Sequence, residues 1–143
     1  MNLYIYIEIL EREFLSKLLI AMESASRGIK VHMGRLGSYI KRDFFVPGII
    51  FHKSITPSPH RIIELNEYKK KNFVFTSLDE EVGLVNLDGK EYLKTRYSNE
   101  SISLTDRIFT WGKFDRDNLA REFKEHKSKF VLTGNPRIDF WRK

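Results

Sequence analysis

The sequence predicts an α/β fold: a Rossmann-like three-layer αβα domain with a mostly parallel sheet. Short β-rich runs alternate with longer stretches of helical spacing from one end of the chain to the other. Such an alternation forms βαβ units, whose right-handed crossovers place helices on both faces of the sheet. The length of 143 residues and the lack of a long linker predict one domain over 1–143.

The first half of the chain predicts three strands and three helices. Residues 2–8 are β-rich, and residues 10–27 then carry apolar residues at helical spacing: Leu10, Phe14, Leu18, Ala21, Met22 and Ala25. Gly28 is placed to end this helix. There follow a strand over 29–33 that ends at Gly34, a short helix over 35–42 and a strand over 48–52. The next helix has Ser58 as N-cap and Pro59 in its first turn, and it runs out in lysines 69–71.

The second half continues the same alternation. A strand over 73–77 precedes a less regular stretch, 82–104, with a turn at Asp88-Gly89 and a short helix through Tyr92 and Leu93. A strand over 107–111, a helix over 114–126 and a last strand over 130–133 complete the pattern.

Composition excludes several classes of chemistry. The chain has no cysteine, so disulfides, thiolate catalysis and cysteine-based zinc sites are excluded. The histidines lack metal-binding spacing, so we expect no metal.

No apolar run approaches the roughly 20 residues of a membrane span. We expect a cytoplasmic protein with no transmembrane segment, with peripheral attachment at the inner membrane face as the alternative. The net charge of +6 is spread among acids and no nucleic-acid motif is present, so no nucleic-acid partner is expected.

Polar residues gather where the expected strands end, which is the edge at which open parallel sheets bind ligands. These residues are Glu8; Gly34; His52, Lys53 and Ser54; Asp79, Glu80 and Glu81; Trp111 and Gly112; and Gly134, Asn135, Pro136 and Arg137. The group predicts a site rim of acids, basic residues, small residues and an aromatic ring.

The three consecutive acids Asp79, Glu80 and Glu81 are the main catalytic candidates. A carboxylate at this edge could act as general base towards a hydroxyl nucleophile, or hold sugar hydroxyls or a metal. A solvated acidic turn is the alternative interpretation.

The other rim residues are candidates for substrate binding. Lys53 and Ser54 could meet a phosphate, although no Gly-rich run precedes them; an exposed lysine beside a capping serine is the alternative. Gly34 could present backbone amides to an anion at a helix start, or simply form a turn. His52 is a candidate base, against the alternative of a core or rim histidine.

The first helix carries two charge pairs at i,i+4 spacing, Glu8 with Arg12 and Glu13 with Lys17. Each would support an exposed helix by a few tenths of a kcal/mol. In this interpretation Glu8 alone, at the junction of strand and helix, is placed for a ligand.

An ordered set of motifs runs over nearly the whole chain. It comprises Glu8 with Arg12-Glu13-Phe14 and Lys17-Leu18-Leu19; Ala25-Ser26-Arg27-Gly28; Val31 with Gly34; Lys53-Ser54; Asp79-Glu80-Glu81 with Gly83-Leu84; Glu91-Tyr92 with Arg96; Trp111-Gly112; and Thr133-Gly134-Asn135-Pro136-Arg137-Ile138-Asp139. The set resembles the bacterial surface carbohydrate biosynthesis proteins. These are similar in architecture to GT-B glycosyltransferases and to the polymerases of teichoic acid and capsule assembly.

The resemblance implies the acceptor-side, N-terminal half of such an enzyme in surface polysaccharide biosynthesis. It places the Asp79–Glu81 group in the cleft, with Glu80 or Glu81 as the base, and implies a glycan or lipid-linked acceptor. The nucleotide-sugar donor would bind a second domain or chain, because the sequence stops four residues after Asp139. We therefore expect a domain that is inactive alone, without a cofactor of its own, and an exposed apolar surface near Phe140 and Trp141.

Two other functions compete with this expectation. One is a stand-alone, flavodoxin-like module that binds a nucleotide or phosphate at Gly34 or Lys53. The other is half of an enzyme like the nucleotide-sugar epimerases, which would need the same missing domain.

Overall fold

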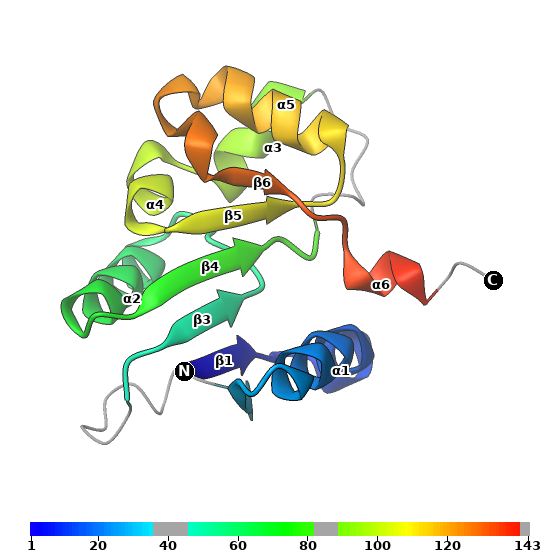
Figure 1. Ribbon diagram of the computed structural model, residues 1–143. Helices are drawn as coiled ribbons and strands as arrows, with labels where there is room; N and C mark the ends of the chain where they lie inside the picture. Colours follow the sequence, from blue (N-terminus) through cyan, green and yellow to red (C-terminus); the bar gives the residue numbers. More distant parts are fainter. Residues whose placement is uncertain (36–45, 82–88, 141–143) are drawn as a thin grey trace.

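The computed structural model describes residues 1–35, 46–81 and 89–140 (Figure 1). Its centre is a six-stranded sheet in the order β2-β1-β3-β4-β5-β6, in which every pair of neighbouring strands is parallel. The strands are β1 (Asn2–Tyr6), β2 (Lys30–Gly34), β3 (Ile49–His52), β4 (Val74–Leu78), β5 (Arg107–Thr110) and β6 (Phe130–Leu132). The predicted α/β class is confirmed.

Helices lie on both faces of this sheet. They are α1 (Leu10–Ser26), α2 (Pro59–Lys70), α3 (Gly89–Arg96), α4 (Asn99–Leu104), α5 (Lys113–Glu122), the 3₁₀ helix η2 (Lys124–Lys129) and α6 (Pro136–Asp139). Helices α2, α3, α4 and α5 pack on one face, whereas α1 and α6 lie together on the other (Figure 1). This is the three-layer, Rossmann-like arrangement.

Alternate strand residues build two cores, one on each face of the sheet. Tyr4, Ile50 and Phe75 belong to the larger core with side chains of α2 to α5. Leu3 and Phe51 belong to a smaller core with side chains of α1. The period of two along each strand therefore separates the layers, as the pleat of a β-strand requires.

Two expected helix ends are present, and a third, the start of α6, was not predicted. Gly28 has φ of 78° directly after the C-cap of α1, a conformation that glycine adopts without a Cβ clash. The Ser58 side chain accepts a hydrogen bond from the Arg61 N–H, with Pro59 in the first turn of α2. Asn135 caps α6 in the same way by accepting from the Arg137 N–H at 2.9 Å.

Several element boundaries differ from the sequence prediction. The strand expected over 107–111 ends at Thr110, and the helix expected over 114–126 ends at Glu122 and continues as η2. Helix α4 was not predicted; its start is a reciprocal capping box between Ser98 and Ser101, both short polar residues. Of the short helix expected over 35–42, residue 35 alone is described and it is not helical, and of the turn at Asp88-Gly89 only Gly89 is described, where it begins α3.

The apolar residues whose spacing predicted α1 are mostly not buried. Of the six apolar positions at helical spacing, Ala21 alone is buried, while Leu10 and Met22 are 58% and 61% exposed. The buried residues of this helix are Glu13, Ser16, Lys17 and Ala21. Helix α1 thus turns a largely polar face towards the sheet.

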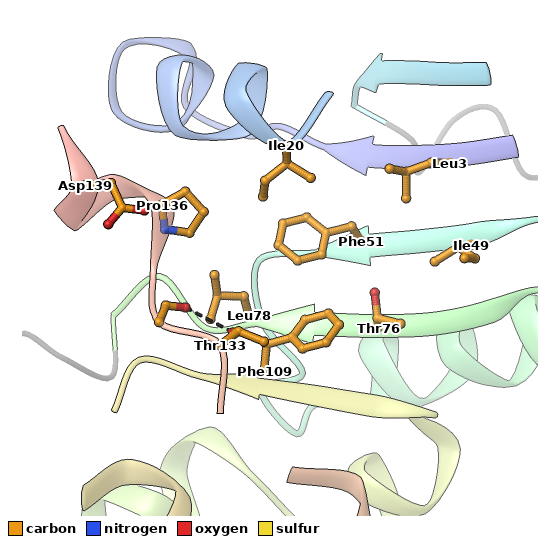
Figure 2. A pocket seen from close by; sticks show the side chains of 11 residues that line it. Leu3, Ile20, Ile49, Phe51, Thr76, Leu78, Phe109, Thr133, Pro136 and Asp139 are labelled. Atoms are coloured by element: carbon orange, nitrogen blue, oxygen red, sulfur yellow. Dashed lines mark hydrogen bonds between the residues drawn. The ribbon is translucent and has the colours of Figure 1, made fainter. Parts of the chain in front are cut away.

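The face that carries α1 and α6 holds an apolar cavity of about 380 Å³ (Figure 2). Sheet residues form its floor, among them Ile49, Phe51 and Phe109, and Ile20 of α1 and Pro136 of α6 stand at its rim. Phe140, directly after α6, is 47% exposed, and Trp141 lies outside the described residues. In the described ranges no helix is long and apolar enough to cross a membrane.

Candidate functional site

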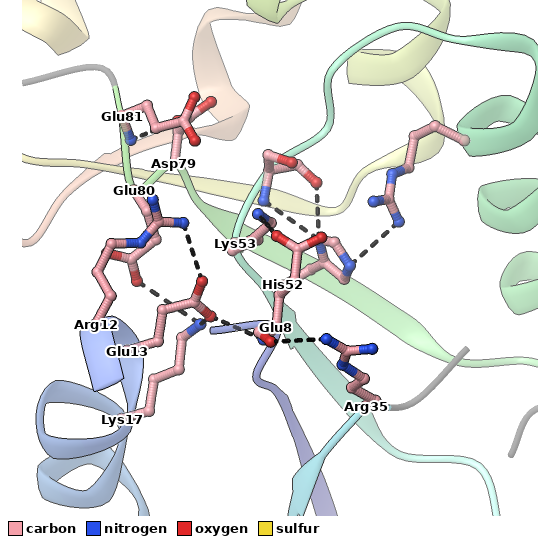
Figure 3. A network of polar contacts seen from close by, with 12 residues as sticks. Glu8, Arg12, Glu13, Lys17, Arg35, His52, Lys53, Asp79, Glu80 and Glu81 are labelled. Atoms are coloured by element: carbon pink, nitrogen blue, oxygen red, sulfur yellow. Dashed lines mark hydrogen bonds and ion pairs between the residues drawn. The ribbon is translucent and has the colours of Figure 1, made fainter. Parts of the chain in front are cut away.

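The strand order fixes where a ligand site is expected. From β1 the chain goes to β2 on one side and, later, to β3 on the other, so the order reverses between β1 and β3. In open parallel sheets, ligands bind at the carboxyl ends of the strands beside such a reversal. Glu8 follows β1, Lys53 follows β3 and Glu80 follows β4 at this edge (Figure 3).

Helix α1 contributes a buried lysine between two carboxylates. Lys17 Nζ lies 2.6 Å from Glu13 Oε2 and 3.8 Å from Glu80 Oε1, and these three side chains are 1%, 0% and 4% exposed. Glu13 Oε1 also accepts a hydrogen bond from Arg12 Nη2 at 3.2 Å. Its other oxygen accepts one from the Glu8 backbone N–H. Ion pairing of buried charges explains why the polar face of α1 turns inward, since an unpaired buried charge would be far more costly.

Glu80 has the features expected of a general base. Its Oε2 atom is buried and has no hydrogen-bond partner in the described part of the chain. Burial raises the pKa of Glu80, and the charge of Glu13 adds to this effect, while Lys17, Arg137 and Arg12 lower it in part. A carboxylate whose pKa is moved towards neutrality accepts protons more readily.

Asn135 brings a donor to the same edge. Its Oδ1 atom is used in the cap of α6, and its Nδ2 atom is buried without a hydrogen-bond partner among the described residues. The side chain is 5% exposed as a whole. A buried amide donor without a partner costs stability, so a ligand hydroxyl or anion would relieve that cost.

The three consecutive acids point to different partners. Arg96 binds the Asp79 carboxylate with two hydrogen bonds, of 3.0 and 2.8 Å, and it also binds Glu81 Oε2 at 2.9 Å. Asp79 additionally accepts the Glu81 N–H, and its burial raises its pKa although Arg96 acts against this. Asp79 and Glu81 therefore hold Arg96, whereas Glu80 faces the cluster on α1. Their predicted catalytic roles remain predictions, which this geometry favours only for Glu80.

Glu8, which follows β1, pairs with Lys53, which follows the neighbouring strand β3. It does not pair with Arg12, as the i,i+4 spacing predicted. The Arg35 side chain donates to the Glu8 carbonyl at 3.2 Å. Gly34 has φ of 152°, and its carbonyl accepts the Ile7 N–H at 2.9 Å. A phosphate at Lys53 would have to compete with the Glu8 carboxylate. The helix expected after Gly34 lies outside the described residues.

His52 is a core histidine. It is fully buried and stacks on Tyr6 and Phe75, with ring centroids 4.3 and 5.6 Å away. Its Nε2 atom lies 3.1 Å from Arg61 Nη1, which can only donate. Its Nδ1 atom lies 2.9 Å from the Ser54 carbonyl oxygen and 3.2 Å from the Ser54 backbone nitrogen. Burial, with the charge of Arg61, holds the pKa of His52 well below its ordinary value.

The structure gathers part of the predicted rim into one cluster. Glu80 and Arg137 meet Arg12, Glu13 and Lys17, whereas Gly34, Lys53 and Ser54 lie towards β2 and β3 and Asn135 follows β6 at the same edge of the sheet. Sequence reasoning assigned Glu13 and Lys17 to an exposed pair and so missed them. Their position on one helix face with Ser16 and Ala21 was the available signal, because small and polar residues sharing a face can mark the side that packs.

No family model, curated protein or solved structure matches this chain. The functional argument therefore rests on the geometry of the site. Within 1–35, 46–81 and 89–140, no group of three or more histidines, aspartates or glutamates is placed to hold a metal ion.

Proposed function

We propose that this chain is the acceptor-side domain of a glycosyltransferase-like protein for bacterial surface polysaccharide, with Glu80 as general base. One observation carries the proposal. At the ligand-binding edge of a parallel sheet, Glu80 keeps a buried carboxylate oxygen without a hydrogen-bond partner in the described residues, and burial raises its pKa. Asp79 and Glu81 are already engaged with Arg96.

The reaction assigned to this site is transfer of a sugar to an acceptor hydroxyl. Glu80 takes the hydroxyl proton while the oxygen forms its bond to the anomeric carbon of a nucleotide-sugar. The bond from that carbon to the phosphate oxygen breaks, and its electron pair leaves with the nucleotide. In this proposal Asn135 donates to the acceptor through Nδ2, which is buried without a hydrogen-bond partner among the described residues. The donor binds a second domain or chain, because rate enhancement depends on aligning both substrates.

The charge around Glu80 favours an anionic acceptor. Arg12, Lys17 and Arg137 all act on the Glu80 carboxylate, against the single further negative charge of Glu13. A phosphorylated or lipid-linked glycan carries the complementary sign.

Ligand-observed NMR tests the proposal, with glucose 1-phosphate and methyl β-glucoside as probes. We expect both to bind at pH 8, the phosphorylated sugar more tightly. The variant Glu80→Gln should weaken the methyl glucoside by roughly tenfold, the loss of one charged hydrogen bond of about 1.4 kcal/mol. Glu67→Gln, an exposed glutamate on α2, is the matched control. Absence of binding by both sugars would contradict the proposal.

A second candidate, the nucleotide- or phosphate-binding module, is favoured by the strand order. The order 2-1-3-4-5 is that of flavodoxin-like folds, which place a phosphorylated ligand at the β1/β3 reversal. Lys53 lies at that reversal and Gly34 ends β2 on the other side of β1, although Glu8 neutralises Lys53. Titration with UDP and with inorganic phosphate separates the candidates. UDP binding that Lys53→Ala abolishes and Glu80→Gln leaves intact would favour the module.

A further inference from the structure

Two buried polar atoms of opposite kind in the Glu80 cluster have no hydrogen-bond partner among the described residues. They are Arg12 Nε, which can only donate, and Glu80 Oε2, which accepts when the carboxylate is ionised. A buried polar group without a partner costs stability, and native structures hold few of them. A donor and an acceptor left over in one cluster point to a ligand group that supplies the complement of each.

The contacts of the cluster hold Arg12 and Glu80 on the same side of the ligand-binding edge. Arg12 stands in the first turn of α1 and donates to Glu13 through Nη2 at 3.2 Å, so that Nε is the atom left without a partner. Lys17 joins Glu13 to the other oxygen of Glu80. The charge of Arg12 acts on the Glu80 carboxylate, and Figure 3 shows the two side chains next to each other.

This donor and acceptor together select the chemical group that can bind between them. A hydroxyl group has one hydrogen to donate and lone pairs that accept, so it can serve Glu80 Oε2 and Arg12 Nε at once. Sulfate or the dianion of a phosphate monoester has acceptors but no hydrogen to donate, and its charge repels the carboxylate. An ammonium group has the opposite fault, because it offers Arg12 no acceptor.

We propose that Arg12 is a second substrate-binding residue, which together with Glu80 holds one hydroxyl of a sugar acceptor. The inference rests on the proposed function and adds to it this residue and the group that it binds. A hydroxyl whose lone pair accepts from Arg12 turns its hydrogen away from the guanidinium and towards Glu80. Arg12 thereby orients the hydroxyl for the proton transfer assigned to Glu80. The cations of the cluster attract an anionic acceptor as a whole, whereas the pair of atoms decides which of its groups enters.

Direct pairing of Arg12 with Glu80 is the competing arrangement, since it would satisfy both atoms without a ligand. In the structure Arg12 pairs with Glu13 instead, and Glu80 with Lys17. A direct ion pair would also lower the pKa of Glu80, whereas burial raises it. The competing arrangement predicts that a neutral sugar gains nothing from Arg12.

The variant Arg12→Lys separates the Nε donor from the charge, because lysine keeps the positive charge but not the guanidinium N–H groups. In ligand-observed NMR at pH 8, methyl β-glucoside should bind this variant about tenfold more weakly than the unaltered chain. Arg27→Lys, at the exposed pair with Glu23 on the same helix, is the matched control and should bind like the unaltered chain. Circular dichroism checks that both variants are folded. Equal affinities of Arg12→Lys and the unaltered chain would overturn the proposal.

The monodeoxy derivatives of methyl β-glucoside give a reading that does not depend on the folding of a variant. The derivative that lacks the hydroxyl held by Arg12 and Glu80 should bind the unaltered chain about tenfold more weakly than the parent sugar. Its loss should be smaller with Arg12→Lys, where one of the two contacts is already gone. Derivatives that all bind like the parent would overturn the proposal.

Competition with sulfate tests whether the pair prefers a hydroxyl to an anion. Sulfate has no hydrogen at pH 8, so an excess of it should not displace methyl β-glucoside. Displacement would show that the pair is an anion site and would overturn the proposal. Glucoside binding that depends on Glu80 but not on Arg12 would overturn this inference and leave the proposed function standing, whereas absence of glucoside binding to the unaltered chain would contradict both.

Discussion

The ammonium group of Lys17 lies 2.6 Å from the Glu13 carboxylate, with both side chains buried from solvent. The same ammonium group reaches Glu80 at 3.8 Å. Opposing effects act on the two acids. Burial would raise the pKa of Glu13, but hydrogen bonds from Lys17, the Glu8 backbone and Arg12 together hold it below its ordinary value. Glu80 has the longer contact and keeps a raised pKa. Glu13 is thus the structural partner of Lys17, and Glu80 is the acid to which the proposed function gives the chemical role.

Replacing Lys17 should be strongly destabilising. Lys17→Met removes the ammonium group shared by the buried Glu13 and Glu80 and leaves Glu13 with Arg12 alone, and removal of one partner from a buried pair typically costs about 3–5 kcal/mol. Urea denaturation followed by circular dichroism measures this loss. Lys70→Met, which breaks the exposed pair with Glu67, should cause no measurable change. Equal effects of the two substitutions would contradict the assignment.

The variant Glu80→Gln should become more stable, relative to the unaltered chain, as the pH rises. Because its folded-state pKa is raised, the unaltered Glu80 contributes stability below about pH 4.5, and that stability is lost as the pH rises through the folded-state value. Glu80→Gln removes this term. The difference in unfolding free energy between the variant and the unaltered chain should therefore grow in favour of the variant from pH 4 to pH 8. A constant difference across this range would show that Glu80 is not perturbed.

Arg96 should be required for folding stability, and lysine should replace it poorly. Arg96→Ala removes the two hydrogen bonds that Arg96 donates to the buried Asp79, with an expected cost of about 3–5 kcal/mol. Arg96→Lys keeps the charge but not the bidentate geometry, so we expect only partial recovery. Thermal unfolding ranks the variants, with Arg116→Ala at the exposed Asp117 pair as control. Full stability of Arg96→Ala would contradict a structural role for Asp79.

His52 should make the chain less stable in mild acid. Its folded-state pKa lies well below 6.5, so its contribution is present above pH 6.5 and is lost as the pH falls towards the folded-state value. The unfolding free energy should fall by at most about 1.4 kcal/mol per pH unit from this one group. Denaturation of the unaltered chain and of His52→Gln at pH 7.5 and 5.5 isolates the effect. A steeper fall in the variant than in the unaltered chain would refute it.

Gly48 should not tolerate a side chain. A Cβ atom at this position would lie 2.4 Å from the Asn2 carbonyl oxygen, where β1 and β3 come together. Gly48→Ala must therefore move one strand, and overpacking of this kind costs about 1–3 kcal/mol. At Gly112 a Cβ atom meets nothing within 4 Å, so Gly112→Ala is the matched control. We expect the urea denaturation midpoint of Gly48→Ala to be lower than that of Gly112→Ala, and equal midpoints would contradict the prediction.

Local signals in the sequence predicted most elements correctly. The N-cap at Ser58 and the stop at Gly28 depend on a few neighbouring residues, and both are found as expected. Helix α4 was not predicted, because its six residues are too few to show a helical period. For the same reason, the change from α5 to η2 at Phe123 has no signal in the spacing of apolar residues.

The sequence predicted the edge of the sheet at which the candidate site lies, but not which of its acids has which partner. Parallel strands end at a common edge, so the residues after each strand had to gather there. The sequence could not separate Asp79, Glu80 and Glu81, because their partners come from elsewhere in the chain. Arg96 follows 17 residues after Asp79, and Lys17 stands on the first helix.

From the sequence alone followed the alternation of strands and helices, the parallel sheet and the gathering of polar residues at one edge, since each depends on local periodicity and strand direction. Tertiary structure alone decided the rotation of α1 about its axis. Helical spacing favoured an inward Leu10, Phe14 and Met22, but the buried charges of Glu13, Lys17 and Glu80 can be paired only when the polar face of the helix turns inward. The ion cluster is formed by residues far apart in the chain, and it leaves Leu15, Leu19 and Met22 of α1 exposed, because one helix cannot turn both faces to the sheet.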